Sequence, residues 1–193
     1  ENRDNMTNYR DSIINQVNVA INDKDNPNNV FTEDDFNPDI IILSAGTNLY
    51  YLGSYESAMK KTVYVEGTNN INIDATLENL NKNACIDALR SSLLTLKKEW
   101  PMAQIYVVLP IQRVSTELTF SNRLEQIKLM ALRYGAVVIN GTDNGIIADD
   151  NVQGSSGATL SDGLHPNQNG QYLMTRQILK SLENNYFDYS LLD

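Results

Sequence analysis

The chain has 193 residues, of which 41% are hydrophobic and 20% charged, a composition typical of a globular protein. This length suffices to bury a core without disulfides or metals, so we expect a single domain over residues 1–193. The formal net charge of -9 argues against binding nucleic acid through its phosphates and against attraction to anionic membranes. No apolar run approaches the roughly 20 residues of a membrane span, so no membrane partner is expected.

The sequence contains one cysteine, Cys85, and one histidine, His165. A single cysteine can form neither an internal disulfide nor a zinc–thiolate site, and a single histidine excludes a multi-histidine metal site. We therefore expect no metal site of these kinds, and we expect no metal and no cofactor in the protein. Cys85 is interpreted as a packing residue on a helix face rather than as a reactive thiol.

The first part of the chain predicts a helix, a strand and a long loop. Apolar residues spaced three or four apart over residues 5–22 predict an amphipathic helix, and the Asn- and Asp-rich residues 23–35 predict a loop. The segment DIIILSAG, residues 39–46, contains the continuously apolar and mostly β-branched run Ile40–Leu43, which predicts a strand over 39–44 in the middle of a parallel sheet. Residues 49–70 contain several tyrosines and glycines without a clear period, which favours a long functional or lid-like loop.

The rest of the chain alternates predicted helices and strands. A stripe that includes Leu80 and Ala88 predicts a helix from residue 74 that ends near Pro101. Further along, we predict a strand over 104–109, a helix over 121–134 capped by Gly135, a strand over 136–140, a loop over 141–161 and a helix over 167–183.

This alternation predicts a three-layer α/β domain with a parallel sheet flanked by helices. Three strands are few for such a fold, and the first helix has no preceding strand. An apolar strand such as 39–44 is not expected at an exposed edge, where its unpaired amides invite aggregation. We therefore expect this strand to need a partner on its outer side, supplied by N-terminal strands missing from these residues or by another chain.

The segment SDGLHPNQNGQ, residues 161–171, carries the strongest candidate site. Asp162 lies three residues before His165, and Pro166 suits the start of a helix. A carboxylate beside an imidazole can hold the tautomer of the ring and stabilise the imidazolium that forms when the ring accepts a proton. The alternative interpretation is a surface histidine beside an aspartate that caps a helix.

The segment SAGTN, residues 44–48, directly follows the first predicted strand. Ligands in parallel α/β sheets bind beyond the carboxyl ends of the strands. Gly46 would allow a sharp exit from the strand, and the amide of Asn48 could then donate to a developing oxyanion. The alternative interpretation is ordinary turn chemistry.

These two segments together resemble the GDSL/SGNH hydrolase family of serine esterases. PDIIILSAGTN, residues 38–48, is similar to the third block of that family, and SDGLHPNQNG, residues 161–170, is similar to its fifth block. The order and separation of the two segments also match, and the resemblance covers essentially the whole chain. It implies a flavodoxin-like sheet and the hydrolysis of an ester.

By this resemblance, His165 is the general base and Asp162 is its orienting carboxylate. The substrate implied is a small-molecule or glycan ester, such as a carbohydrate O-acetyl ester. No signal peptide is found in the first thirty residues, so the sequence leaves the cellular location unknown. Analogy with the family alone favours a secreted or periplasmic location. The resemblance also implies that Asn48 lies in the oxyanion hole, and Gly46 of the same segment is assigned there with it. Tyr50 and Tyr51, in the loop over residues 49–70, are predicted to bind the substrate because their rings suit stacking on a sugar or an acyl group.

The chain departs from the family pattern in two respects. Leu49 stands where the family often has Asp, and neither the Gly-Asp-Ser block with the nucleophile nor the second block is found before residue 38. We therefore expect the serine to lie outside this sequence, and a separate N-terminal segment that completes the sheet is the candidate partner. Ser44 is interpreted as a core residue, Ser155 and Ser156 as residues of a Gly-Ser loop, and Ser161 as a brace of the turn.

Two other functions are weighed against an esterase. The missing nucleophile favours a non-catalytic binding or assembly module of the same fold, whereas Asp162, His165 and Asn48 together argue for catalysis. A flavodoxin-like nucleotide or flavin binder is disfavoured because the chain has no Gly-rich phosphate loop. If the esterase hypothesis is correct, these three side chains should converge at the carboxyl ends of the strands.

Overall fold

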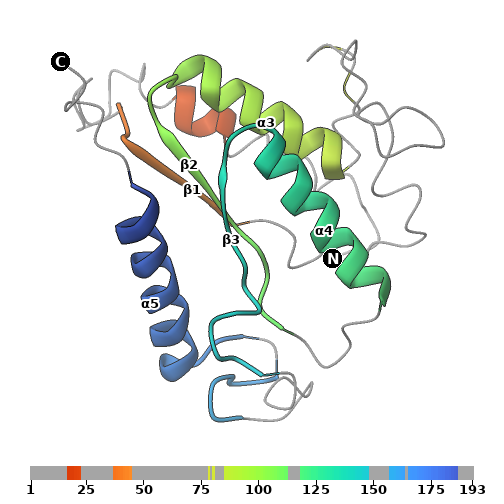
Figure 1. Ribbon diagram of the computed structural model, residues 1–193, viewed down its shortest axis with the longest axis vertical. Coiled ribbons are helices and arrows are strands. Elements are labelled where there is room, and N and C mark those ends of the chain that lie inside the picture. The colour runs from red at the N-terminus through yellow and green to blue at the C-terminus, as the bar shows by residue number, and fades with distance from the viewer. Residues whose placement is uncertain are drawn as a thin grey trace.

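This computed structural model describes residues 17–22, 37–44, 78, 80, 85–112, 118–147, 157–163 and 165–186. The elements in chain order are β1 (Ile40–Ser44), α3 (Cys85–Glu99), β2 (Gln104–Val108), α4 (Leu118–Arg133), β3 (Val137–Ile139) and α5 (Gln168–Asn185), drawn in Figure 1. Residues 17–22 are also helical. The described elements confirm the predicted α/β alternation.

The three described strands form one parallel sheet in the order β1-β2-β3. Ile42 of β1 is opposite Tyr106 of β2, which is in turn opposite Val137 of β3. Since parallel strands point the same way, their carboxyl ends lie at one edge of the sheet, where ligands bind in open α/β folds. The loops that leave this edge are therefore the ones that matter for function.

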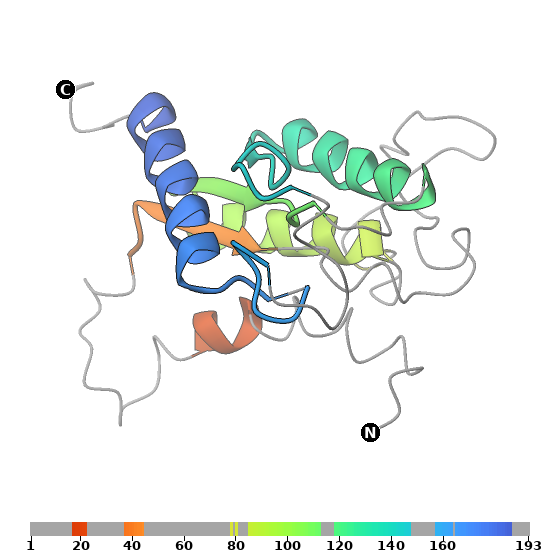
Figure 2. The same cartoon turned by 90° about the horizontal axis from the view of Figure 1, so that it is seen from below.

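Helices α3 and α4 cover one face of the sheet, and α5 lies on the other side of the strands (Figures 1 and 2). Alternate residues of a strand point to opposite faces. Ile105 and Val107 of β2 accordingly pack into the core on the α3 and α4 side. The helix residues of that core include Leu89, Leu93, Leu96, Ile127, Met130 and Ala131.

The opposite face of β2 packs against α5. Tyr106 and Val108 lie there with Ile139 of β3, and Ile178 and Leu182 of α5 pack against them. The sheet is therefore the middle of three layers, as the sequence predicted. Burial raises the pKa of the Tyr106 phenol above its usual value, and the neighbouring Tyr186 raises it further.

The start of α3 differs from the prediction. We expected a helix from residue 74, but Leu80 lies in a bend, and α3 is first described at Cys85. The surrounding sequence is rich in asparagine, whose side chain competes for backbone hydrogen bonds and favours turns over helix. Leu80 is nevertheless buried, so its apolar character was a sign of core packing rather than of helix.

The end of α3 and the caps of the later elements agree with the sequence. Helix α3 ends at Glu99, before Pro101. Gly135 follows α4 with a φ of 72°, the left-handed conformation expected of a helix-capping glycine. The helix predicted over residues 167–183 is α5, with its N-cap at Asn167. The side chain of Cys85 lies outside what the structure describes.

Strand β1 lies at an edge of the described sheet. Among the described residues, no strand pairs with its outer side, and Ile42 is 45% exposed whereas its partner Tyr106 is fully buried. Ser44 is also exposed, so the prediction that it is a core residue was wrong. Its position at the end of an edge strand leaves it without the cover that a central strand receives.

None of the described helices is both long enough and apolar enough to cross a membrane.

Candidate functional site

His165 belongs to a loop that we call the histidine loop, residues 157–163 and 165–167. This loop lies at the carboxyl-end edge of the sheet, because its fully buried Leu160 packs with Ile111, which follows β2, and Ile146, which follows β3. Leu173 and Met174 of α5 pack against the same cluster. Apolar contacts therefore anchor the loop to the sheet edge, although the loop itself is largely polar.

Backbone hydrogen bonds close the histidine loop. Leu160 and Pro166 form an antiparallel bridge, and the N–H of Asn167 donates to the carbonyl of Thr159 at 3.0 Å. At the tip, the N–H of Ser161 donates to the carbonyl of His165 at 2.9 Å, and the Ser161 hydroxyl donates to the same oxygen at 3.1 Å. These bonds hold the two sides of the loop together just below its tip.

Asp162 contacts His165 through both carboxylate oxygens. Oδ1 accepts the backbone N–H of His165 at 2.7 Å, and Oδ2 lies 2.5 Å from the ring Nδ1. Gly163, between them, has a φ of 77°, which a glycine adopts without the strain that a side chain would bring. The carboxylate therefore fixes both the backbone and the ring of the same histidine.

The His165 side chain is 71% exposed, and that of Asp162 is 49% exposed. Among the described residues, no hydrogen bond is made to the ring Nε2. A carboxylate acceptor at Nδ1 requires a proton there, which leaves the lone pair of Nε2 available in the neutral ring. This arrangement can accept a proton from a group that approaches Nε2.

Helix α5 begins immediately after the histidine loop. Asn167 is its N-cap and accepts from the N–H groups of Asn169 and Gly170. Pro166 was expected to suit the helix start, but it lies one residue before the cap and pairs with Leu160 instead. The asparagine takes the cap position because its side-chain oxygen satisfies the free amides of the first turn.

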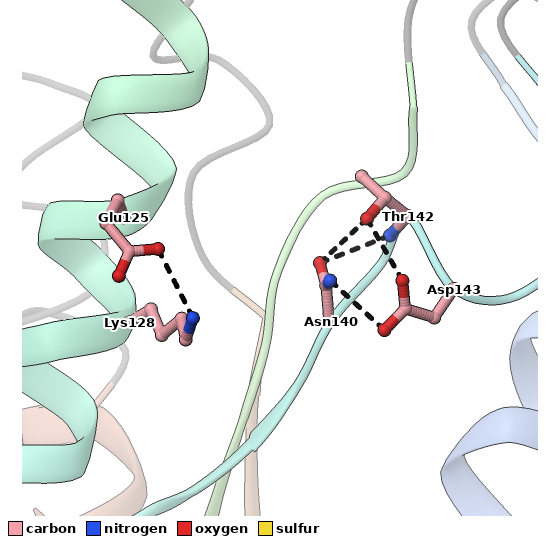
Figure 3. Close-up of polar contacts among 5 residues, drawn as sticks. All are labelled: Glu125, Lys128, Asn140, Thr142 and Asp143. Carbon is pink, nitrogen blue, oxygen red and sulfur yellow. Dashed lines mark hydrogen bonds and ion pairs between the residues drawn. The ribbon is translucent and has the colours of Figure 1, made fainter.

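The loop after β3 carries a polar cluster that the sequence interpretation did not single out (Figure 3). The amide of Asn140 donates to Asp143 at 3.1 Å, and the hydroxyl of Thr142 donates to the Asn140 side chain at 3.0 Å. Gln177 of α5 donates to the Asn140 carbonyl at 2.6 Å. The turn-forming sequence NGTDNG, at the end of the predicted strand over residues 136–140, was the available signal. These bonds fix the loop beside α5. Figure 3 also shows the Glu125–Lys128 pair, which is a separate, exposed contact within α4.

The structure brings together two of the predicted site residues, Asp162 and His165. The other four, Asn48, Gly46, Tyr50 and Tyr51, lie outside the described residues, so their predicted positions stay predictions. The same holds for Ser155 and Ser156. Among the described residues, no group of three or more His, Cys, Asp or Glu is placed to hold a metal ion.

Comparison with known proteins supports the fold. No protein-family model and no curated protein matches the chain. A solved protein from Lactobacillus plantarum is 19% identical and matches with a TM-score of 0.52 over 77% of this chain and 68% of its own. A protein from Parabacteroides merdae, assigned in its name as a GDSL-like lipase, is 16% identical, with a TM-score of 0.50 over 78% of this chain and 62% of its own.

These structural likenesses show a GDSL/SGNH-like fold, in agreement with the fold class predicted from the sequence. The matched region is less than two thirds of the Parabacteroides protein. At this identity the likeness concerns the fold alone.

Proposed function

We propose that this chain carries the general base of a serine ester hydrolase and the carboxylate that orients it. The observation that supports this most directly is the contact of Asp162 with both the backbone N–H and the ring Nδ1 of His165. A histidine held in this way, exposed at the carboxyl-end edge of a GDSL-like sheet, has the tautomer and the access that a general base requires.

In the proposed reaction, a serine hydroxyl attacks the acyl carbonyl of the ester while Nε2 of His165 accepts its proton. Asp162 stabilises the imidazolium that results. The imidazolium then gives its proton to the departing alcohol, which leaves an acyl-enzyme. Water hydrolyses this intermediate by the same route, so that the carboxylic acid is released and the serine is regenerated. Asn48 and Gly46 are proposed as donors to the oxyanion.

The nucleophilic serine is proposed to lie in a Gly-Asp-Ser block outside these 193 residues. Ser161 is a poor alternative because its hydroxyl donates to the backbone carbonyl of His165 rather than to the ring. Ser44 is exposed at the carboxyl end of β1, but it makes no hydrogen bond to His165 among the described residues. The outer side of β1, with which no strand of the described residues pairs, is the proposed position for a strand from an additional N-terminal segment.

The proposed substrate is a small-molecule or glycan ester, with a carbohydrate O-acetyl ester as the first to test. Tyr50 and Tyr51 are proposed to line its site, because tyrosine rings can stack on a sugar or cover an acyl group.

The test combines turnover with labelling of the nucleophile. The chain is assayed together with the N-terminal segment that carries the proposed Gly-Asp-Ser block. The substrates are p-nitrophenyl acetate and an O-acetylated sugar, and the wild type is compared with His165→Ala, with Asp143→Asn as a control for a carboxylate of the neighbouring loop. We expect turnover to fall with His165→Ala only. A fluorophosphonate probe followed by peptide mass spectrometry should modify one serine, and the His165→Ala variant should label more slowly.

Turnover that is equal in wild type and His165→Ala would contradict the proposal. The absence of both turnover and serine labelling would favour the second candidate, a non-catalytic binding or assembly module. That candidate is favoured by one observation, namely that no described serine hydroxyl contacts the ring of His165.

A further inference from the structure

The side chain of Asn167 makes more contacts than a helix cap requires. Its Oδ1 accepts from the N–H groups of Asn169 at 2.9 Å and Gly170 at 3.1 Å, which is the ordinary work of an N-cap. Its Nδ2 also donates to the carbonyls of Gly157 at 3.3 Å and Ala158 at 3.2 Å. The acceptor half of the amide serves α5, and the donor half serves the opposite end of the histidine loop.

The donor half connects two segments that are about ten residues apart and flank the catalytic candidate. Gly157 and Ala158 begin the histidine loop, and Asn167 ends it. Asn169 adds a parallel bond from its own Nδ2 to the carbonyl of Ala158 at 3.1 Å. These side-chain bonds therefore close the base of the loop whose tip holds Asp162 and His165.

We propose that Asn167 is a positioning residue for His165, because its donor bonds to Gly157 and Ala158 hold the loop in which Asp162 fixes the imidazole ring. Both members of the pair are substantially exposed, so packing alone does not hold them at the tip. The geometry of the tip depends on the backbone beneath it, and the side chain of Asn167 joins the two ends of that backbone in addition to the backbone hydrogen bonds. As a contribution to catalysis this inference rests on the proposed function, whereas the control of the ring does not.

Substitution of Asn167 by aspartate separates its two roles. Aspartate is nearly the same size and remains a good N-cap, favoured further by the helix dipole. It has no donor, so a carboxylate oxygen would face the carbonyls of Gly157 and Ala158 where an amide N–H₂ now lies. Asn167→Asp should therefore retain α5 and loosen the histidine loop.

The readout is the tautomer of His165, measured by ¹⁵N NMR on the 193-residue chain at alkaline pH, where imidazole is neutral. His165 is the single histidine of the chain, so its ring signals need no assignment by mutation. In the wild type we expect Nδ1 to carry the proton, because the Asp162 carboxylate accepts it. In Asn167→Asp we expect a shift towards protonation at Nε2, the form that free imidazole side chains prefer.

The matched control is Asn185→Asp at the other end of α5. Asn185 also donates through Nδ2 to a backbone carbonyl, that of Ser181 at 2.7 Å, so the chemical change is the same and lies far along the helix from the histidine loop. This variant should keep the wild-type tautomer. Asn167→Ser, which retains a capping oxygen without a charge, repeats the test in a neutral form if Asn167→Asp does not fold.

A folded Asn167→Asp or Asn167→Ser variant with the wild-type tautomer would overturn the proposal, as would an equal shift in Asn185→Asp. The pH profile of ester turnover, measured for the same variants with the segment that carries the proposed serine present, gives a second readout. If the tautomer shifts in Asn167→Asp but the protein shows no ester turnover, the positioning role is supported and the proposed function fails. Failure of the positioning role and failure of the proposed function can therefore be told apart.

Discussion

Asp162 uses one carboxylate to bind two different nitrogens of His165, and this detail decides what a substitution would do. Oδ1 accepts the backbone N–H and Oδ2 faces the ring Nδ1. The backbone nitrogen of His165 can only donate, so an asparagine side chain in place of Asp162 would turn its amide oxygen towards that nitrogen. The amide N–H₂ would then face the ring and require Nδ1 to be the acceptor.

We therefore predict that Asp162→Asn reverses the tautomer of His165, with the proton moved to Nε2. If the proposed function is correct, kcat should fall by up to about 10⁴-fold, the size of effect associated with a wrong tautomer in a serine triad. The measurements are the ¹⁵N ring signals of the single histidine of this chain and the turnover of p-nitrophenyl acetate with the segment that carries the proposed serine present. Asp143→Asn is the control, and the prediction is wrong if Nδ1 stays protonated in Asp162→Asn.

Tyr106 supports a second prediction, on the pH dependence of stability. Burial chiefly, and then Tyr186, raise the pKa of its phenol in the folded protein above the value of about 10 in the unfolded chain. A raised acid pKa means that the unfolded state loses its proton first. The stabilising contribution is therefore complete below about pH 10 and is lost as the pH rises through the folded pKa.

We expect the free energy of unfolding, from urea titrations, to fall more steeply above about pH 10 in the wild type than in Tyr106→Phe. Tyr172→Phe is the matched control, because it removes the same hydroxyl from a side chain that is 65% exposed rather than buried. Parallel slopes in the wild type and Tyr106→Phe would contradict this prediction.

At the scale of the element, the first turn of α5 is packed directly against the histidine loop. A Cβ at Gly170 would lie 2.2 Å from the carbonyl oxygen of Thr159 and 3.0 Å from Cβ of Pro166. The first of these contacts is with backbone, which cannot move aside without displacing the loop. The close approach of helix to loop is thus the reason for glycine at a helical position where it is otherwise unfavourable.

Gly170→Ala should therefore destabilise the protein, although glycine to alanine within a helix ordinarily stabilises by about 1 kcal/mol. We expect a net loss of about 1–3 kcal/mol, the usual cost of overpacking, and a disturbed His165 signal. Urea unfolding and NMR are the measurements. Thr175→Ala, at an exposed position of the same helix, should be neutral or slightly stabilising, and the same result for Gly170→Ala would sink the idea.

At the scale of the whole molecule, the outer side of β1 is the feature that most needs explanation. The strand IIILS carries no charge and no proline, and Ile42 is 45% exposed at the edge of the described sheet. Natural edge strands usually carry charges, prolines or bulges that prevent pairing with other chains. An apolar edge of this kind is suited to receive another strand.

We predict that the 193-residue chain self-associates at high concentration and that Ile42→Lys reduces this association. Sedimentation velocity over a range of concentrations is the measurement. Leu132→Lys is the control, because Leu132 is similarly exposed at 51% but lies on α4. Association that is lost with Leu132→Lys and kept with Ile42→Lys would place the contact elsewhere.

Local sequence determined the alternation of elements and the pairing of Asp162 with His165. Continuous β-branched runs predicted β1, β2 and β3, and Gly135 marked the end of α4, because these signals arise from neighbours along the chain. An aspartate three residues before a histidine can reach it within one turn. That contact therefore needed no knowledge of the rest of the fold.

Only the tertiary structure decided which surfaces are covered and what holds the histidine loop. Ser44 and Ile42 belong to an apolar strand, yet they are exposed because of their place at the sheet edge. The bonds from Asn167 to Gly157 and Ala158, and the close packing of Gly170, join positions separated along the chain. Contacts of this kind depend on how the loop folds back on α5, and periodicity and local propensity carry no information about them.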